Sequence, residues 1–159
     1  MATKINAAYA VAMAYALPGQ VSDTSAYNID GACVLDEGDI LVGVAVQVKE
    51  VDPLGHKVMK PMAGGGTPYG VAIRSHFQTT SKTGMMVYEA GGGINVMTAG
   101  RVWMVSKDDA AQTFGAPVKL NESGEVDNGT GQVVTGWTYT GGYTKWGEII
   151  LSEVQLHQL

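Results

Sequence analysis

The sequence predicts an all-β protein, a single β-barrel or β-sandwich domain that follows an extended N-terminal arm. Of its 159 residues 22 are glycine and 16% are charged, which is too glycine-rich for a helical protein and too apolar for a disordered one. Short β-favouring runs recur about every eight to twelve residues between turn signals. A chain of this length can bury a core without disulfides or metals. We expect less than about a tenth of the residues in helices.

The composition also excludes several classes of function. The single cysteine, Cys33, cannot form an internal disulfide, and the histidines at positions 56, 76 and 157 lack metal-ligand spacing. Ten basic residues are scattered singly among fifteen acidic ones, so no basic patch could follow a phosphate backbone. No apolar run is long enough to cross a membrane as a helix. We expect no metal, no cofactor, no nucleic-acid partner and no membrane attachment.

Residues 1–17 form the predicted N-terminal arm. The segment is rich in alanine and carries larger apolar side chains, among them Tyr9, Met13, Tyr15 and Leu17. A solvated tail has little use for so much apolar surface, so we expect these side chains to dock onto a neighbouring subunit. The alternative is a signal peptide, because residues 14–16 match the small-x-small pattern of a cleavage site. The run is mostly alanine rather than leucine, which argues against that alternative.

Pro18 and Gly19 end the arm, because proline disfavours helix at the residue before it and glycine permits a turn. The folded domain is therefore predicted to span residues 18–159. Its first strand is expected at residues 33–35, where Cys33 is interpreted as a small buried hydrophobic residue. An acidic turn at residues 36–39 follows.

Residues 40–48 form a continuous β-branched run that predicts one buried strand. Gly43 lies inside this run and suggests a bulge or a close backbone approach rather than a turn. Residues 49–68 contain prolines and a glycine triplet, which predicts a loop with only brief regular structure. The next strands are expected at residues 69–74 and 85–88, with an exposed polar loop at 78–84 between them.

Residues 94–105 are the longest uninterrupted β-favouring run and the predicted centre of the fold. Apolar and polar residues alternate on both sides of Ala99 and Gly100, which supply a bend. The run is therefore a strand pair or one long bent strand. Trp103 can anchor a core by itself, because an indole buries on the order of 150 to 250 Å².

The remaining chain predicts one helical turn at residues 107–113 and three strands at 116–120, 132–139 and 148–156. Turns are expected at residues 121–124, which would form a hairpin, and at Gly141-Gly142.

No set of residues forms a convincing catalytic or metal site. Ser75, His76 and Asp39 do not make a hydrolytic triad, because Ser75 lacks the Gly-x-Ser-x-Gly elbow and neighbouring strand residues point to opposite faces. The acidic residues at 36–39 do not follow the spacing of a calcium loop. The glycine triplets at 64–66 and 91–93 are interpreted as turns, because no helix or Lys-Ser/Thr follows them. We expect no enzymatic activity.

Four aromatic residues near the C terminus leave a second function open. They are Trp137, Tyr139, Tyr143 and Trp146, and such rings can stack on a sugar. Packing in the core, in a hairpin or against another subunit is the favoured interpretation of these rings. A carbohydrate-binding module or tail-fibre domain is the alternative function.

The order of short motifs resembles that of tailed-bacteriophage structural cement, or capsid decoration, proteins. The motifs are Pro-Gly-Gln at 18–20 with Asp23 after it, Gly-Val-Ala-Val at 43–46, Gly-Val-Ala-Ile at 70–73, Gly-Arg-Val-Trp-Met-Val at 100–105 and Gly-Ala-Pro-Val at 115–118. Met104 stands where valine is expected. The similarity covers roughly residues 15–155, and the order of the motifs carries it.

The resemblance implies a non-enzymatic protein that binds the outer surface of a bacteriophage capsid and bridges neighbouring major capsid protein subunits. It also implies a homo-oligomer, which we expect to be a dimer or trimer, made in the host cytoplasm and carried on the virion. The predicted contacts with the capsid or a sister subunit are Tyr9, Met13, Tyr15, Leu17 and Pro18.

Overall fold

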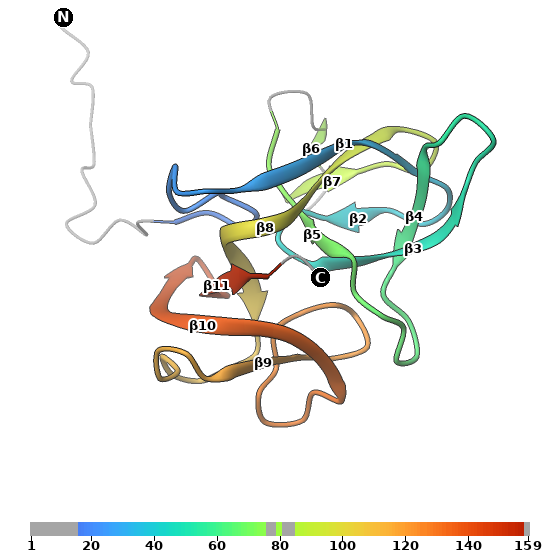
Figure 1. Cartoon of the computed structure of the whole chain (residues 1–159). Coiled ribbons are helices and arrows are strands. Elements are labelled where there is room, and N and C mark those ends of the chain that lie inside the picture. The colour runs from blue at the N-terminus through green and yellow to red at the C-terminus, as the bar shows by residue number, and fades with distance from the viewer. Residues whose placement is uncertain (1–15, 76–78, 81–84, 158–159) are drawn as a thin grey trace, which may run out of the picture.

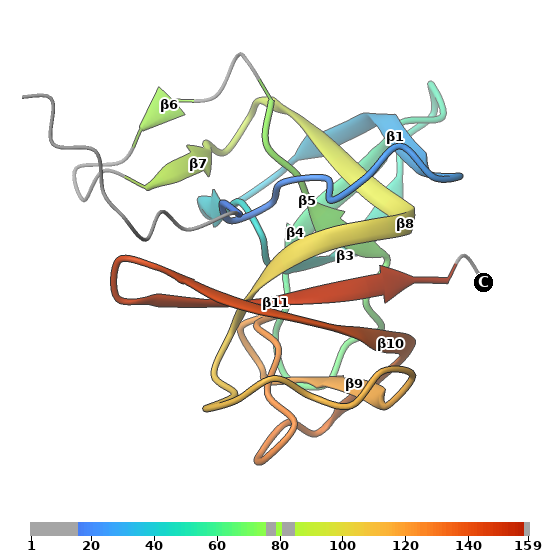
Figure 2. The ribbon, with the colours of Figure 1, turned by 90° about the vertical axis from the view of Figure 1, so that its left-hand side faces the viewer.

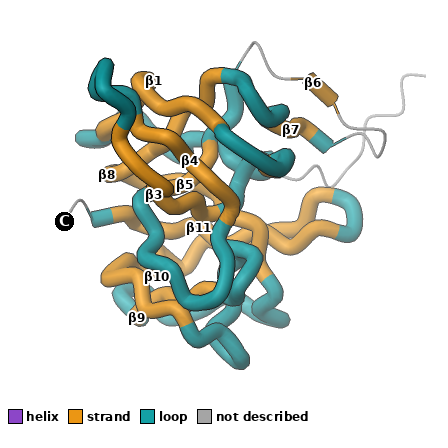
Figure 3. The backbone as a smooth tube through the Cα atoms, turned by 90° about the vertical axis from the view of Figure 1, so that its right-hand side faces the viewer, coloured by secondary structure: helices purple, strands orange, loops and turns teal. Residues whose placement is uncertain are grey.

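The computed structural model describes residues 16–75, 79–80 and 85–157. Within these ranges the chain forms strands and loops but no helix (Figure 3), which confirms the predicted all-β class. It follows that no described helix could cross a membrane. The strands are β1 (Asn28–Leu35), β2 (Ile40–Leu41), β3 (Ala45–Val51), β4 (Lys57–Pro61), β5 (Gly70–Ala72), β6 (Thr79–Thr80), β7 (Met86–Tyr88), β8 (Gly93–Ser106), β9 (Pro117–Leu120), β10 (Val133–Trp146) and β11 (Ile149–Leu156).

The first part of the chain closes into a barrel with the strand order β1-β4-β3-β5-β8, because β8 pairs back with β1. β1 and β4 are parallel, and the other pairs are antiparallel. Past the barrel, β8 continues and pairs with β11, which is followed by β10 and β9 (Figure 1). The small sheet β2-β7-β6 lies beside the barrel (Figure 2). The barrel is therefore extended by additional strands on one side.

β8 joins the two parts of the fold as one long bent strand, which was one of the two forms predicted for residues 94–105. The bend is at Gly100, whose φ is 109°. Ile94 faces the first core cluster before the bend, whereas Trp103 faces the same cluster after it. The residues of β8 that face this cluster thus have even numbers before the bend and odd numbers after it. A β-bulge, which inserts one extra residue into a strand, produces such a change.

Two core clusters fill the molecule. The first contains Leu35, Met59 and Trp103, and the second contains Met104 and Tyr139. Trp103 is 5% exposed, which confirms its predicted place in the core. Cys33 is also buried, and burial followed by the nearby Asp30 charge raises the pKa of its thiol to about 12. The thiol thus stays protonated, in agreement with its interpretation as a small hydrophobic residue.

One prediction for residues 40–68 was wrong, and a second was only partly right. The single strand expected at 40–48 is divided into β2 and β3 by a turn, because Gly43 has a φ of 85° that a strand does not permit. The segment 49–68, expected to be a loop with brief regular structure, is mostly loop but contains the end of β3 and all of β4. These strands form a hairpin because Val58 and Met59 bury their side chains against the barrel core. The prediction of a loop at 78–84 falls largely outside the described residues, apart from the short strand β6.

Two further predictions in the second half were wrong. Residues 107–113 form a loop instead of a helical turn, because Asp108 is buried and holds two distant segments. Its carboxylate accepts hydrogen bonds from the Tyr139 hydroxyl at 2.7 Å and the Asn128 amide at 2.8 Å. Gly141 and Gly142 are not a turn but a bulge inside β10, and the chain reverses at Gly147 instead.

Candidate functional site

The arm-exit strap, residues 16–22, is the segment that joins the predicted arm to the barrel. It runs beside β8, with Val21 opposite Val102 in an antiparallel bridge. The Gly19 amide donates to the Trp103 carbonyl at 2.8 Å, and the Arg74 amide donates to the Gly19 carbonyl at 2.9 Å. Both polar groups of the Gly19 backbone are thus fixed, one by β8 and the other by the chain that follows β5.

A close approach of two backbones holds the strap in place. A Cβ atom on Gly19 would lie 2.9 Å from the Gly43 nitrogen and 3.0 Å from the Ala72 carbonyl oxygen. A Cβ atom on Gly43 would lie 2.8 Å from the Gly19 nitrogen. Only glycine fits at either position. The suggestion of a close approach at Gly43 is therefore confirmed, although the residue also forms a turn.

Of the five predicted interface residues, the structure describes two. Tyr9, Met13 and Tyr15 lie outside the described residues. Leu17 is partly exposed, and Pro18 is buried. Ala16, two residues before Pro18, is already packed in the first core cluster. The barrel thus fixes both the position and the direction of the chain at the point where the arm begins.

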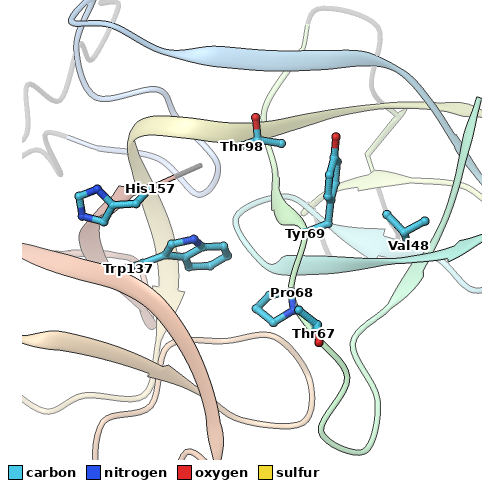
Figure 4. Close-up of a pocket in the computed structure, with 7 residues that line it drawn as sticks. All are labelled: Val48, Thr67, Pro68, Tyr69, Thr98, Trp137 and His157. Carbon is cyan, nitrogen blue, oxygen red and sulfur yellow. The ribbon is translucent and has the colours of Figure 1, made fainter. Parts of the chain in front are cut away.

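A pocket of about 320 Å³ lies between the barrel and the second core cluster (Figure 4). It is lined by Val48, Thr67, Pro68, Tyr69, Thr98, Trp137 and His157. Tyr69 is held by Asp30, whose carboxylate accepts a 2.7 Å hydrogen bond from its hydroxyl. Thr98 is held by Asn28, whose side-chain amide donates to its hydroxyl at 2.8 Å. These bonds from β1 fix two walls of the pocket.

The carboxylate of Asp30 also binds the ammonium of Lys57 at 2.7 Å and the amide of Ala32 at 3.0 Å. Burial acts to raise the pKa of Asp30, but the hydrogen bonds from Lys57, Tyr69 and Ala32 outweigh it and lower the pKa from 3.8 to about 2. An acid with a lowered pKa stabilises the fold above its unfolded pKa, and this stabilisation is lost as the pH falls toward the folded value.

We expect Asp30→Asn to lower the free energy of unfolding at pH 7 by on the order of 2 kcal/mol. Between about pH 4 and pH 2 the variant should also lose less stability than the parent. Urea unfolding at a series of pH values measures both effects. Glu37→Gln removes an exposed negative charge and serves as the control. The same pH slope in the parent and in Asp30→Asn would show that the carboxylate does not stabilise the fold.

The described residues among the candidates that the sequence analysis rejected as catalytic or metal-binding lie apart from one another or have other partners. Asp39 is exposed and accepts a hydrogen bond from the Ala90 amide at 3.3 Å. Asp36 forms an ion pair with Lys49. His76 lies outside the described residues. Among the residues that the structure describes, no group of three or more His, Cys, Asp or Glu side chains could hold a metal ion.

The C-terminal aromatic residues do not form an exposed platform for a sugar. Trp137 and Tyr139 are buried in the second core cluster, whereas Tyr143 and Trp146 are partly buried on the β10–β11 hairpin. Trp146 packs against the first core cluster. The interpretation of these rings as core and hairpin residues is therefore confirmed.

Sequence reasoning missed the tip of the β3–β4 hairpin. Leu54 is 82% exposed and Val51 is 61% exposed there. The Asp52 carboxylate accepts hydrogen bonds from the amides of Leu54 and His56, both at 2.8 Å, and so fixes the turn. Asp-Pro at residues 52–53 and Gly55 are a turn signal, but the same pattern does not reveal that apolar side chains point outward.

Comparisons with known proteins find one family model and a solved structure with a similar fold. A family model described as "Structural cement protein (E217 gp24/Pam3 gp6)" matches residues 5–155. One chain of a solved structure titled "The capsid of Myoviridae Phage XM1" has a similar fold, with a TM-score of 0.70 and 18% sequence identity. The similarity covers 98% of each chain. No curated protein sequence matches significantly.

Proposed function

This chain belongs to the phage structural cement protein family and stabilises a capsid, and we propose that it does so from the outer surface by means of its N-terminal arm. In this role the arm binds the major capsid protein or a sister copy, while the barrel remains outside and bridges neighbouring subunits. The protein acts without enzymatic activity, nucleic acid or membrane. It acts as a homo-oligomer, a dimer or trimer, that is made in the host cytoplasm and joins the virion.

The observation that carries this proposal is the anchored strap at residues 16–22. A cement protein that attaches through its arm needs a stable connection between the arm and the barrel, so this segment must not unfold locally. The strap meets this need, because its backbone hydrogen bonds with β8 continue from Gly19 to Ser22. Its close contact with Gly43 also leaves no room for the strap to slide.

The composition of the arm supplies the attachment. Tyr9, Met13 and Tyr15 are large apolar side chains in the part of the arm before the strap. Burial of each against a partner contributes roughly 1.5 to 3 kcal/mol before the cost of ordering the arm is subtracted. Leu17 adds a partly exposed apolar side chain at the exit itself, and the buried Pro18 fixes the direction of the chain.

The proposal predicts that deletion of residues 2–14 weakens attachment to capsids by at least about a hundredfold. The barrel should keep its melting temperature within a few degrees, because the strap and Ala16 are retained. Co-sedimentation with decoration-free capsid shells measures attachment, and light scattering measures oligomer size.

A second variant separates the apolar contacts from the length of the arm. Tyr9→Ser, Met13→Ser and Tyr15→Ser are combined in a full-length arm, and we expect the combination to lose most of the same attachment. If the deleted protein decorates shells with unchanged affinity and keeps its oligomer size, the arm is a passive tail and the proposal is wrong.

A further inference from the structure

The pocket beside Trp137 contains a buried hydrogen-bond donor that has no partner within the part of the chain that the structure describes. Trp137 is 3% exposed and its backbone amide donates to the Thr135 hydroxyl at 2.9 Å. Its indole N–H, in contrast, has no acceptor among residues 16–75, 79–80 and 85–157. Figure 4 shows the indole projecting from β10 into the pocket, with its nitrogen on the ring edge turned toward β8. A buried N–H without a partner costs about 1 to 3 kcal/mol, so native proteins rarely leave one.

The walls of the pocket define the chemistry of a suitable ligand. Val48, Pro68 and the ring of Tyr69 offer apolar surface, and the Thr98 hydroxyl can still donate a hydrogen bond because it already accepts one from Asn28. His157 at the exposed rim shares a 3.1 Å hydrogen bond with the Thr138 hydroxyl. Among the described residues that line the pocket there is no Asp, Glu, Lys or Arg. It therefore fits an uncharged apolar group that carries an acceptor oxygen, such as a tyrosine side chain or a peptide carbonyl.

The direction of the strap separates each arm from the pocket of its own copy. Val21 pairs antiparallel with Val102, so toward the N terminus the strap runs toward the C-terminal end of β8. Thr98 lies in the opposite direction along β8, five residues before Trp103, which is at most about 17 Å at the rise of a straight strand. In Figure 2 the strap begins on the left, whereas the end of β11, which leads to His157 of the pocket lining, lies on the right. An arm that leaves one side is thus placed to reach the opposite side of a neighbouring copy.

Length and charge fit this arrangement. The 15 residues before the strap can extend to about 50 Å, which is enough to reach a neighbouring barrel. Lys4 is their only charged side chain, so the rest of the chain has nine basic and fifteen acidic residues and a net charge of −6. A basic arm is attracted to an acidic body.

We propose that the Trp137 pocket receives the N-terminal arm of a second copy, with the indole N–H donating a hydrogen bond to an oxygen of that arm. The inference rests on the proposed function, because it assigns a docking site to the same arm. A head-to-tail contact of this kind links copies into a ring or a continuous network.

The test follows the Trp137 indole signal in ¹H–¹⁵N spectra of the full-length protein. ¹⁵N-labelled protein without a nitroxide is mixed with protein of natural isotope abundance that carries a nitroxide on Ala8→Cys. Cys33 is buried and should not be labelled. Trp137→Phe assigns the indole signal. We expect the nitroxide on the copies without ¹⁵N to broaden the Trp137 indole signal of the ¹⁵N-labelled copies, but not their Trp146 signal. A second sample contains copies that carry both ¹⁵N and the nitroxide. Broadening in this sample but not in the mixture, or no broadening in either, would overturn the inference.

Self-association provides a second measurement. Trp137→Phe keeps an aromatic ring but removes the N–H, so we expect dissociation constants to rise about tenfold in sedimentation equilibrium. In a protein that already lacks residues 2–14, Trp137→Phe should not raise the dissociation constant further. Additive losses would show that the pocket and the arm act separately. Trp146→Phe is the matched control. Attachment of the unmodified protein to capsid shells tests the proposed function alone, so failure of the pocket assignment can be recognised separately.

Discussion

Gly19→Ala should lower the free energy of unfolding by about 3 kcal/mol, which is large for the addition of one methyl group. Gly19 has a φ of 69°, which costs an L-residue roughly 1 to 2 kcal/mol. The new methyl would also lie 2.9 Å from the Gly43 nitrogen and 3.0 Å from the Ala72 oxygen. Both are backbone atoms within a hydrogen-bonded region, so they cannot turn aside as a side chain could, and overpacking adds roughly 1 to 3 kcal/mol.

Gly64→Ala is the matched control, because Gly64 has a φ of 55° and no atom within 4 Å of the position of a Cβ. It should lose only about 1 kcal/mol from backbone strain. Urea unfolding of the two variants separates the contact between strap and barrel from the strain. Equal losses would show that the strap does not pack closely against Gly43. A larger loss at Gly19 together with weaker attachment to shells would link the anchoring of the strap to function.

The central strand could be predicted from sequence because its determinants are local. Alternation on both sides of Gly100 and the large side chain of Trp103 are visible within twelve residues. The same local rule failed at Gly43. Its contact is with Gly19, which lies 24 positions earlier in the chain, and a strand pattern contains no information about such a distant neighbour. The glycine was recognised as unusual, but its partner could not be named.

The buried features of the candidate pocket were beyond sequence reasoning for a similar reason. Trp137 was correctly placed in the core, but the missing acceptor for its indole N–H depends on the positions of Pro68, Tyr69 and Thr98, which come from separate segments. Asp108 shows the same limit, because the bond to Tyr139 replaces the helical turn that local propensity favoured. Local patterns predicted most of the strands, whereas the Asp108 contacts, which connect distant segments, determined the loop at 107–113.

Trp103→Ala should cost about 3 to 5 kcal/mol of stability, as truncation of a fully packed aromatic residue does. Trp103 connects the core of the barrel with the strap. Its side chain packs in the first core cluster, and its backbone binds the strap through Gly19 and Gln20. Trp146→Ala, on the partly buried hairpin, is the control and should cost less. A Trp103→Ala variant with the stability of the parent would show that the core does not depend on this residue.

A double-mutant cycle with Gly142 tests the packing of the indole directly. A Cβ atom on Gly142 would lie 2.9 Å from the Cη2 atom of Trp103 and 2.7 Å from the Cβ atom of Glu153, so Gly142→Ala alone should destabilise the protein by about 1 to 3 kcal/mol. When Trp103→Ala is already present, one of the two clashes is gone, and the same change should cost less. The difference is a coupling energy of on the order of 1 kcal/mol. Additive losses would mean that the β10 bulge does not pack on Trp103, and that glycine is needed at 142 only because of Glu153.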